Sequence, residues 1–404
     1  MSGIVGSANA GWLKPASRQK TLALPALSDA ETRRERRGTP ISAVRHRCTS
    51  SFSRRGRIEL VSTSYLTRMR LRDVAWNCCY NHLMTILVDD ISALEYYLHH
   101  AITPVMRDRA RLVVQRGMFP TSRPELEAFQ QRSVDIDCRS LHLATLDAGS
   151  RPLKHRFRYR TISRSSLVDS AALPTDNVLL VSPEAALVSV ATKCDFVSLV
   201  ELGSLLCSCF YLCEDREFGI AQRQIPLTSP KSISAFISKN PNLPGAVLTK
   251  RCLGHMVANA ESPMEVKVAM LMCLPRRYGG GALPLPELGF SVNIPDCYRK
   301  TSNAGTFRYD FFWPSNNFEV EYDSDAVHAA TEKLFRDARR RNIIQALGVT
   351  SLSLTRGQVM HEAAFEEFIR ELYSMQGIRY RIPTAQHKAA QRKLRMRLFD
   401  VDRR

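Results

Sequence analysis

Two β-prone runs that flank a turn at Pro314–Asn317 constrain the fold of this 404-residue chain more than any other feature. Proline and asparagine favour tight turns, and aromatic and β-branched residues favour strands, so the segment predicts a β-hairpin. If Trp313 pairs with Phe318, the register places Asp310 directly opposite Glu321. Side chains alternate between the faces of a strand, so both carboxylates are expected on the same face.

The two faces of this predicted hairpin differ in chemistry. One face holds four carboxylates and one arginine: Arg308, Asp310, Phe312, Glu319, Glu321 and Asp323. The other face is apolar and is expected to pack on a core: Tyr309, Phe311, Trp313, Phe318, Val320 and Tyr322. The segment is therefore expected to present an acidic surface on a buried support.

Two carboxylates that face each other across a ladder destabilise it, and a bound divalent cation would reverse that effect. Oxygen-only ligands suit Mg²⁺ or Mn²⁺, so Asp310 and Glu321 are candidate metal ligands. A solvated acidic face, with Arg308 paired to Asp323, is an equally simple reading. A register slip of one residue would also remove the opposition of Asp310 and Glu321.

Other ionisable residues flank the hairpin. His328 follows Asp323 near the start of a predicted helix over 326–347, and it can exchange protons near neutral pH or simply cap the helix. Asp337 and either Arg340 or Arg341 fall on the polar side of that helix. Gly348 is a probable end of the helix, and a β-branched strand is expected at 349–355.

Glu265 begins an upstream helix in the sequence Ser262-Pro263-Met264-Glu265. This pattern predicts a capping box, in which the Glu265 carboxylate bonds back to the start of the helix. A role for Glu265 as a further metal ligand is the alternative reading.

The rest of the chain predicts a mixture of helices and strands. Helices are expected over 61–135, strands over 139–181 and helices over 182–260. Three helix starts share a Ser-Pro pair, because serine caps a helix and proline suits its first position: Ser182-Pro183, Ser229-Pro230 and Ser262-Pro263. The predicted fold class is α/β, with a mostly helical α+β region followed by a mixed sheet flanked by helices. We expect four parts: a basic, disordered segment at 1–60, a helical region at 61–250, a sheet domain at 251–375 and a basic tail at 376–404.

Composition limits the function classes. The net charge is +18, and residues 1–60 and 376–404 contribute +8 and +7 of it, which favours a polyphosphate partner such as DNA. The 11 cysteines form no CxxC pair, so we expect buried free thiols rather than a zinc site. No apolar run is long enough for a membrane helix and no signal peptide is evident, so a cytoplasmic location without membrane contact is expected.

The C-terminal pattern resembles the PD-(D/E)XK nuclease superfamily, and more closely its very-short-patch-repair (Vsr) endonuclease-like group. The resemblance covers about residues 262–375. It rests on Arg308-Tyr309-Asp310-Phe311-Phe312-Trp313-Pro314, Val320-Glu321-Tyr322-Asp323-Ser324, His328, Asp337 with Arg340, and Leu347-Gly348. It implies a restriction-endonuclease-like domain and Mg²⁺- or Mn²⁺-dependent hydrolysis of DNA phosphodiester bonds.

The resemblance also implies roles for individual residues. Asp310 and Glu321 would hold the metal, Asp323 would support it, His328 would handle protons, and Arg340 would contact phosphate. Arg308 is a further candidate for DNA contact, and Glu265 for the metal. The usual lysine after the glutamate is replaced by Asp323 and the usual glycine by Ser324. The residue that would orient the attacking water is therefore missing, and His328 or an arginine would have to replace it.

Residues 139–215 resemble the middle region of AbiEi-type antitoxin-like proteins. The matching features are a strand that contains Leu141-His142, the sequence SPEAAL from Ser182, and the sequence LVELGSLL from Leu199. This resemblance implies a DNA-binding part and a partner toxin. The alternative function is therefore a non-catalytic DNA-binding antitoxin or transcriptional regulator that keeps the nuclease fold.

Overall fold

The computed structural model describes residues 86–116, 141–146, 157–162, 164–168, 171–172, 178–213, 215–216, 218–302, 305–323 and 331–399. The expected disordered segment at 1–60 lies outside these ranges. Within them the chain is a mixture of helices and sheets, so the α/β fold class is confirmed. No helix in the described part of the chain is both long enough and apolar enough to cross a membrane.

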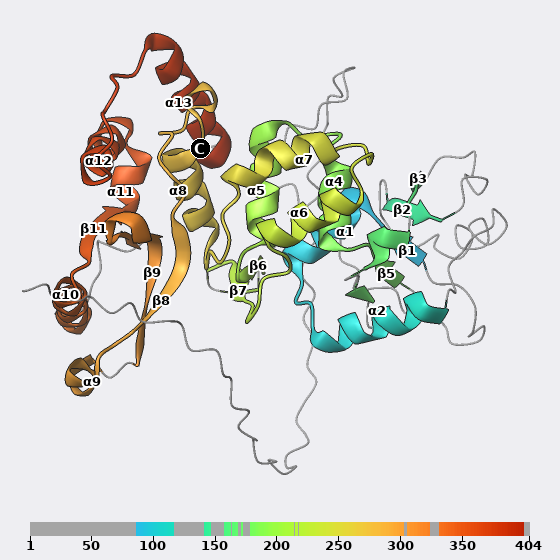
Figure 1. Cartoon of the computed structure of the whole chain (residues 1–404), viewed down its shortest axis with the longest axis horizontal. Helices are drawn as coiled ribbons and strands as arrows, with labels where there is room; N and C mark the ends of the chain where they lie inside the picture. The colour runs from blue at the N-terminus through green and yellow to red at the C-terminus, as the bar shows by residue number, and fades with distance from the viewer. Residues whose placement is uncertain are drawn as a thin grey trace, which may run out of the picture. The chain divides into compact units, whose positions relative to one another are not determined.

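The first half of the described chain is built on a five-stranded sheet and a group of helices (Figure 1). The sheet has the order β3-β2-β1-β5-β4, in which β1 and β5 are parallel and β1 and β2 antiparallel. Its elements are β1 (Ile86–Val88), α1 (Asp90–His99), α2 (Pro104–Arg116), β2 (Leu141–Thr145), β3 (Phe157–Thr161), β4 (Ala171–Ala172) and β5 (Val178–Leu180). The elements that follow are α4 (Pro183–Val190), α5 (Phe196–Leu206), β6 (Phe210–Leu212), β7 (Ile220–Gln222), α6 (Pro230–Lys239) and α7 (Ala246–Cys252).

The second half is built on a four-stranded mixed sheet of order β11-β10-β9-β8. The strands β8, β9 and β10 are antiparallel neighbours, and β11 returns parallel to β10 after helix α10. The elements are α8 (Pro263–Cys273), β8 (Glu287–Asn293), α9 (Asp296–Ser302), β9 (Thr306–Trp313), β10 (Phe318–Asp323), α10 (Thr331–Ala346), β11 (Thr350–Thr355), α11 (Arg356–Met360), α12 (Glu362–Met375) and α13 (Ala385–Phe399).

The three predicted Ser-Pro helix starts are confirmed. The Ser182, Ser229 and Ser262 side chains each accept a hydrogen bond from a backbone N–H in the first turn, at the start of α4, α6 and α8. The strands predicted over 139–181 are present as β2 to β5 in the described residues. The two-stranded β6–β7 sheet was not predicted, because its strands lie in a region with helical periodicity.

The predicted hairpin is present and its register is confirmed over three pairs. Phe318 pairs with Trp313, and the ladder continues to the pair formed by Val320 and Phe311. A short 3-10 turn closes the hairpin, and Asn317 ends it in the left-handed region with a φ of 49°. The ladder ends there, one residue short of the predicted pair between Asp310 and Glu321.

Both faces of this hairpin are covered, whereas the sequence predicted that one would be acidic and solvated. Phe311, Trp313, Phe318 and Val320 join the main apolar core, which also contains residues of α8, α12 and α13. Tyr309 departs from the prediction and joins Phe312 in a second cluster with Ile344 of α10 and Val349. The alternation of side chains therefore breaks between Tyr309 and Phe311, and Asp310 lies at that break.

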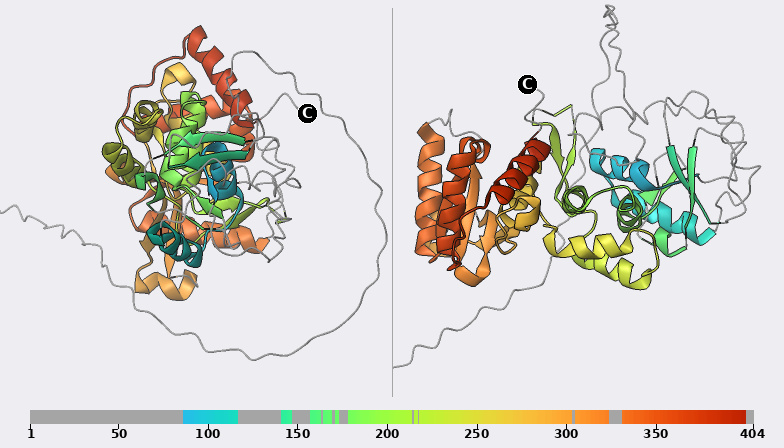
Figure 2. Two further views of the ribbon diagram at one scale, coloured as in Figure 1. Left: turned by 90° about the vertical axis from the view of Figure 1, so that its right-hand side faces the viewer. Right: turned by 90° about the horizontal axis from the view of Figure 1, so that it is seen from above.

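The basic segment after residue 375 is not a free tail. Its helix α13 lies next to α8 in both views of the chain (Figures 1 and 2), and Leu394 and Leu398 are each only 2% exposed. A side chain on Gly279 or Gly280 would collide with backbone, since an added Cβ would lie 2.3 Å from the Ala390 carbonyl oxygen or 2.1 Å from another. The apolar residues four apart on α13 give this segment a buried face that the charge count alone conceals.

Candidate functional site

Asp310 lies where the hairpin ladder ends. Its Oδ2 accepts a hydrogen bond of 2.8 Å from the backbone N–H of Tyr322, and this bond replaces the next pair of the ladder. On the other side of β9, Gly289 of β8 has a φ of 62°, and the β8–β9 ladder lacks a pair at Asp310. Burial raises the pKa of Asp310, and the Tyr322 N–H and the Arg340 guanidinium act in the opposite direction. Local irregularity on both neighbouring strands therefore positions this carboxylate.

Glu321 is held by an arginine of the following helix. The Arg340 Nη1 lies 2.7 Å from the Glu321 Oε1, and both side chains are about three-quarters buried, at 26% and 28% exposure. The Arg340 Nη2 also donates a bond of 2.7 Å to the carbonyl oxygen of Arg308, and its guanidinium lies over the Phe307 ring. The prediction that Arg340 lies beside the carboxylates is thus supported by direct contact, and its observed partner is Glu321.

Glu265 adopts the capping geometry that the sequence predicted, with one difference. Its Oε1 accepts from the Ser262 hydroxyl at 2.7 Å, and its Oε2 accepts from the backbone N–H of Glu261 at 2.8 Å rather than from that of Ser262. Burial raises the pKa of Glu265 to about 7, and the negative charge of Asp310 is the next cause. Glu265 is therefore near Asp310, but its oxygens are engaged at the start of α8.

Arg308 pairs with an acidic residue that the sequence had not singled out. Its Nη1 lies 3.0 Å from the Glu261 Oε1, and its Nη2 donates a bond of 3.1 Å to the carbonyl oxygen of Asn259. Arg308 thus links β9 to the loop before α8. The spacing between Glu261 and the hairpin offered no signal for this contact, because the two segments are far apart in the chain.

Glu319 is a further acidic residue of the site that was not among the predicted site residues. It is fully buried, and its Oε1 accepts a bond of 2.6 Å from the Ser351 hydroxyl of β11. Burial raises the pKa of Glu319 to about 7, and Glu321 and Asp310 add to that rise. Its position two residues before Glu321, on the same strand face, was the available signal.

The remaining predicted residues are placed in part. Asp323 ends β10, is partly buried, and lies opposite Thr355 of β11 in the parallel register. His328 lies outside the described residues. The side chain of Asp337 on α10 also lies outside them.

The cluster combines hard oxygen ligands with positive charge. The structure brings together Asp310, Glu321, Glu319 and Glu265, with Arg340 and Arg308 between them. Among the described residues, no group of three or more histidine, cysteine, aspartate or glutamate side chains converges to hold a metal ion. One oxygen each of Asp310 and Glu321 is already engaged by protein donors, so a cation at this position would compete with Arg340.

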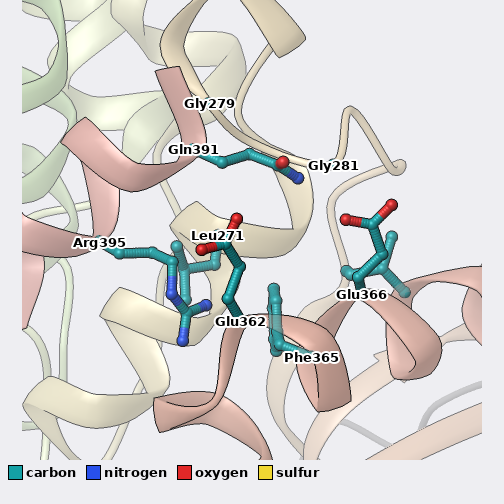
Figure 3. A pocket seen from close by; sticks show the side chains of 9 residues that line it. Leu271, Gly279, Gly281, Glu362, Phe365, Glu366, Gln391 and Arg395 are labelled. Atoms are coloured by element: carbon teal, nitrogen blue, oxygen red, sulfur yellow. The ribbon is translucent and has the colours of Figure 1, made fainter. Parts of the chain in front are cut away.

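A small pocket lies away from this cluster, among α8, α12 and α13 (Figure 3). Arg395 and Gln391 of α13 face Glu362 and Glu366 of α12 across it. The Arg395 side chain is 9% exposed and lies over the Phe365 ring. None of the predicted site residues lines this pocket, so it is a packing feature of α13 rather than part of the candidate site.

A second charged cluster lies at the end of β1. Arg160 of β3 holds the fully buried Asp89 through Nε at 2.7 Å and Nη2 at 3.2 Å, and Lys193 pairs with Asp90. The ring of His142 lies 3.8 Å from the same Asp90 carboxylate, and Asp90 has a φ of 57°. Burial raises the pKa of Asp89 against the lowering effect of Arg160. Each acid here has a cationic partner, as a structural ion-pair network requires.

Comparisons with known proteins give little functional information. No family model matches the chain, and no solved structure matches it significantly. The chain is 29% identical over 118 residues to the uncharacterized proteins MT2308 and Rv2248 of Mycobacterium tuberculosis, strains CDC 1551 / Oshkosh and ATCC 25618 / H37Rv. The match covers 29% of this chain and 39% of the length of each relative. These names state no activity.

Proposed function

We propose that this chain is a Mg²⁺-dependent DNA endonuclease-like protein with a Vsr-like C-terminal domain of the PD-(D/E)XK type. The order of elements supports the proposal: a helix with Glu265, a strand with Asp310, a turn, a strand with Glu321, and a further helix. The three antiparallel strands and the parallel return of β11 after α10 form a mixed sheet flanked by helices, as that resemblance implies.

The observation that carries the proposal is the position of the two carboxylates. Asp310 and Glu321 lie on neighbouring strands at the point where their ladder ends, so their side chains are not needed for regular strand pairing. Burial raises the pKa of Asp310, which is common for groups held at functional sites. A cationic side chain, Arg340, contacts Glu321 directly.

The chain's own residues then take defined roles. Asp310 and Glu321 would hold Mg²⁺ or Mn²⁺, with Asp323 as a supporting carboxylate and Glu265 as a further acid near the site. Mg²⁺ at these oxygens supplies Lewis-acid activation of water and stabilises phosphate charge. Arg340 would leave Glu321 to contact the scissile phosphate, because a guanidinium binds either group through two parallel hydrogen bonds.

Two further residues complete the assignment. His328 would accept or donate the proton in place of the missing lysine. Arg308 already bonds to Glu261, so we assign it the orientation of β9 beside the DNA rather than chemistry. DNA is the proposed substrate, and the cytoplasm is the proposed location.

The test is cleavage of plasmid DNA by the full chain with Mg²⁺, Mn²⁺ or EDTA. Asp310→Ala is expected to abolish metal-dependent cleavage while the circular dichroism spectrum stays unchanged. The matched control is Asp296→Ala, which removes an exposed carboxylate of α9 that pairs only with Arg299 in the same helix turn. Equal cleavage by the wild type and Asp310→Ala would remove the catalytic assignment.

A second function is favoured by one contact. The Glu321 carboxylate is already neutralised by Arg340, which suits a protein that keeps the nuclease fold without its chemistry. In this reading the chain is a non-catalytic DNA-binding antitoxin or transcriptional regulator with a partner toxin. It predicts metal-independent DNA binding, no cleavage by the wild type, and no effect of Asp310→Ala on binding.

A further inference from the structure

The helix α13 has one apolar face and one basic face. Its sequence contains no acidic residue. Leu394 and Leu398 are buried against the domain, whereas Lys388, Arg392 and Lys393 are exposed on the opposite side. The domain therefore fixes the direction in which these three positive charges point.

Further basic residues extend this face beyond the helix. Arg276 donates hydrogen bonds to the carbonyl oxygens of Arg381 and Ile382, at 3.0 Å and 3.5 Å, and so ties the segment before α13 to the 3-10 turn Arg276–Tyr278. Arg277, Arg379 and Arg381 are exposed. We call the following set the α13 basic surface: Arg277, Arg379, Arg381, Lys388, Arg392 and Lys393.

Most of the positive charge of this surface is available to a partner. Arg392 contacts Glu362 at 3.3 Å, but both side chains are well exposed, and such ion pairs contribute little. The other two arginines of α13 have internal partners: Arg397 binds Asp195, and Arg395 binds a backbone carbonyl. The surface therefore excludes them and consists of side chains that reach solvent.

The surface is separate from the carboxylate cluster. In Figure 1, α13 lies at one end of the C-terminal part of the chain and α10, which carries Arg340, at the other. A polyanion on the α13 basic surface would therefore contact the chain outside the site that contains Asp310.

We propose that the α13 basic surface binds the phosphate backbone of duplex DNA. The choice of DNA rests on the proposed function, whereas the need for a polyanion rests on the charge itself. An anionic membrane fits less well, because a helix that lies on a membrane needs an exposed apolar face, and the leucines of α13 are buried in the domain. Arginine and lysine side chains that project from a rigid helix bind phosphates without sequence preference.

The test measures the affinity of the full chain for a labelled DNA duplex by fluorescence anisotropy, with EDTA present so that no cleavage occurs. Lys388→Gln/Arg392→Gln/Lys393→Gln is compared with Lys231→Gln/Lys250→Gln. These control lysines are exposed on α6 and α7, and a third control substitution, Arg251→Gln, equalises the loss of charge.

The expected result follows from counterion release. Each lost phosphate contact lowers the slope of log affinity against log salt by about 0.9, so the α13 variant should lose about 2 to 3 from its slope. Its affinity should fall at least about tenfold at roughly 100 mM salt. The control variant should keep nearly the wild-type slope, and both should melt within about 2 °C of the wild type.

Several outcomes would overturn the proposal. Equal slopes for the two triple variants would show that the charge acts only through the net charge of the chain. Tighter binding to an RNA duplex of the same length, or to phosphatidylserine vesicles, would assign the surface to another partner. Asp310→Ala should bind with the wild-type slope, so a lack of cleavage with this binding intact would contradict only the nuclease proposal.

Discussion

Arg340 offers a test of whether one side chain both stabilises the apo site and opposes a cation there. Arg340→Met removes a 2.7 Å ion pair with Glu321 and a 2.7 Å bond to the Arg308 carbonyl oxygen while keeping much of the side-chain length. Hydrogen bonds to charged groups contribute about 1.5–3 kcal/mol each when buried, and partial exposure reduces this. We expect a total loss of about 2 kcal/mol, or a melting temperature lower by about 4–8 °C.

The same substitution should strengthen cation binding. It removes a positive charge beside Asp310 and Glu321, and at surface-like screening such a charge opposes a second cation by about 1–2 kcal/mol. Titration calorimetry with Mn²⁺ should therefore show roughly tenfold tighter binding to Arg340→Met than to the wild type. The control Arg356→Met removes an exposed arginine at the start of α11 and should change stability by less than about 0.5 kcal/mol.

Two results would refute this reasoning. An unchanged melting temperature would mean that the contact with Glu321 does not form in solution. A less stable variant whose Mn²⁺ affinity stays at the wild-type value would mean that the carboxylates are not a cation site.

Three further predictions concern stability, each measured by urea unfolding. Glu95 on α1 has a pKa raised by burial to about 7, so its contribution is present below about pH 4.5 and is lost as the pH rises to 7; Glu95→Gln should stabilise the chain by about 1–2 kcal/mol at pH 8 and not at pH 4.5, and an equal effect at both would contradict the shift. Leu394→Ala should cost about 2–4 kcal/mol because the side chain is 2% exposed, whereas Met396→Ala, at 47% exposed, should cost little; equal costs would mean that α13 does not dock. Gly280→Ala should destabilise by about 2 kcal/mol or more, since its Cβ would lie 2.1 Å from a carbonyl oxygen, whereas Gly254→Ala meets nothing within 4 Å; a neutral Gly280→Ala would contradict the close approach.

The hairpin register was predictable because its determinants are local. The turn at Pro314–Asn317 and the alternation of the flanking runs are sufficient to pair Phe318 with Trp313. The end of the ladder was not predictable from the hairpin alone. It depends on Asp310 bonding to a backbone N–H and on the left-handed Gly289 in a neighbouring strand.

The partners of the charged residues were the least predictable part of the site. The sequence suggested that Arg308 would pair with Asp323, whereas the observed partner is Glu261, which precedes α8. The burial of Glu319 also depends on α10 and β11, which cover a face that the hairpin pattern indicated to be solvated. The capping role of Glu265 was predictable because it requires only the residues next to it in the chain.

The bond between Arg397 of α13 and Asp195 has a practical consequence for dividing this chain into fragments. Asp195 caps helix α5, and both guanidinium nitrogens of Arg397 hold its carboxylate, at 2.6 Å and 2.7 Å. A fragment that begins near the predicted boundary at residue 250 would keep the arginine and discard its acceptor. Recombinant studies of the C-terminal sheet should therefore start upstream of α5, so that the last helix keeps its anchor.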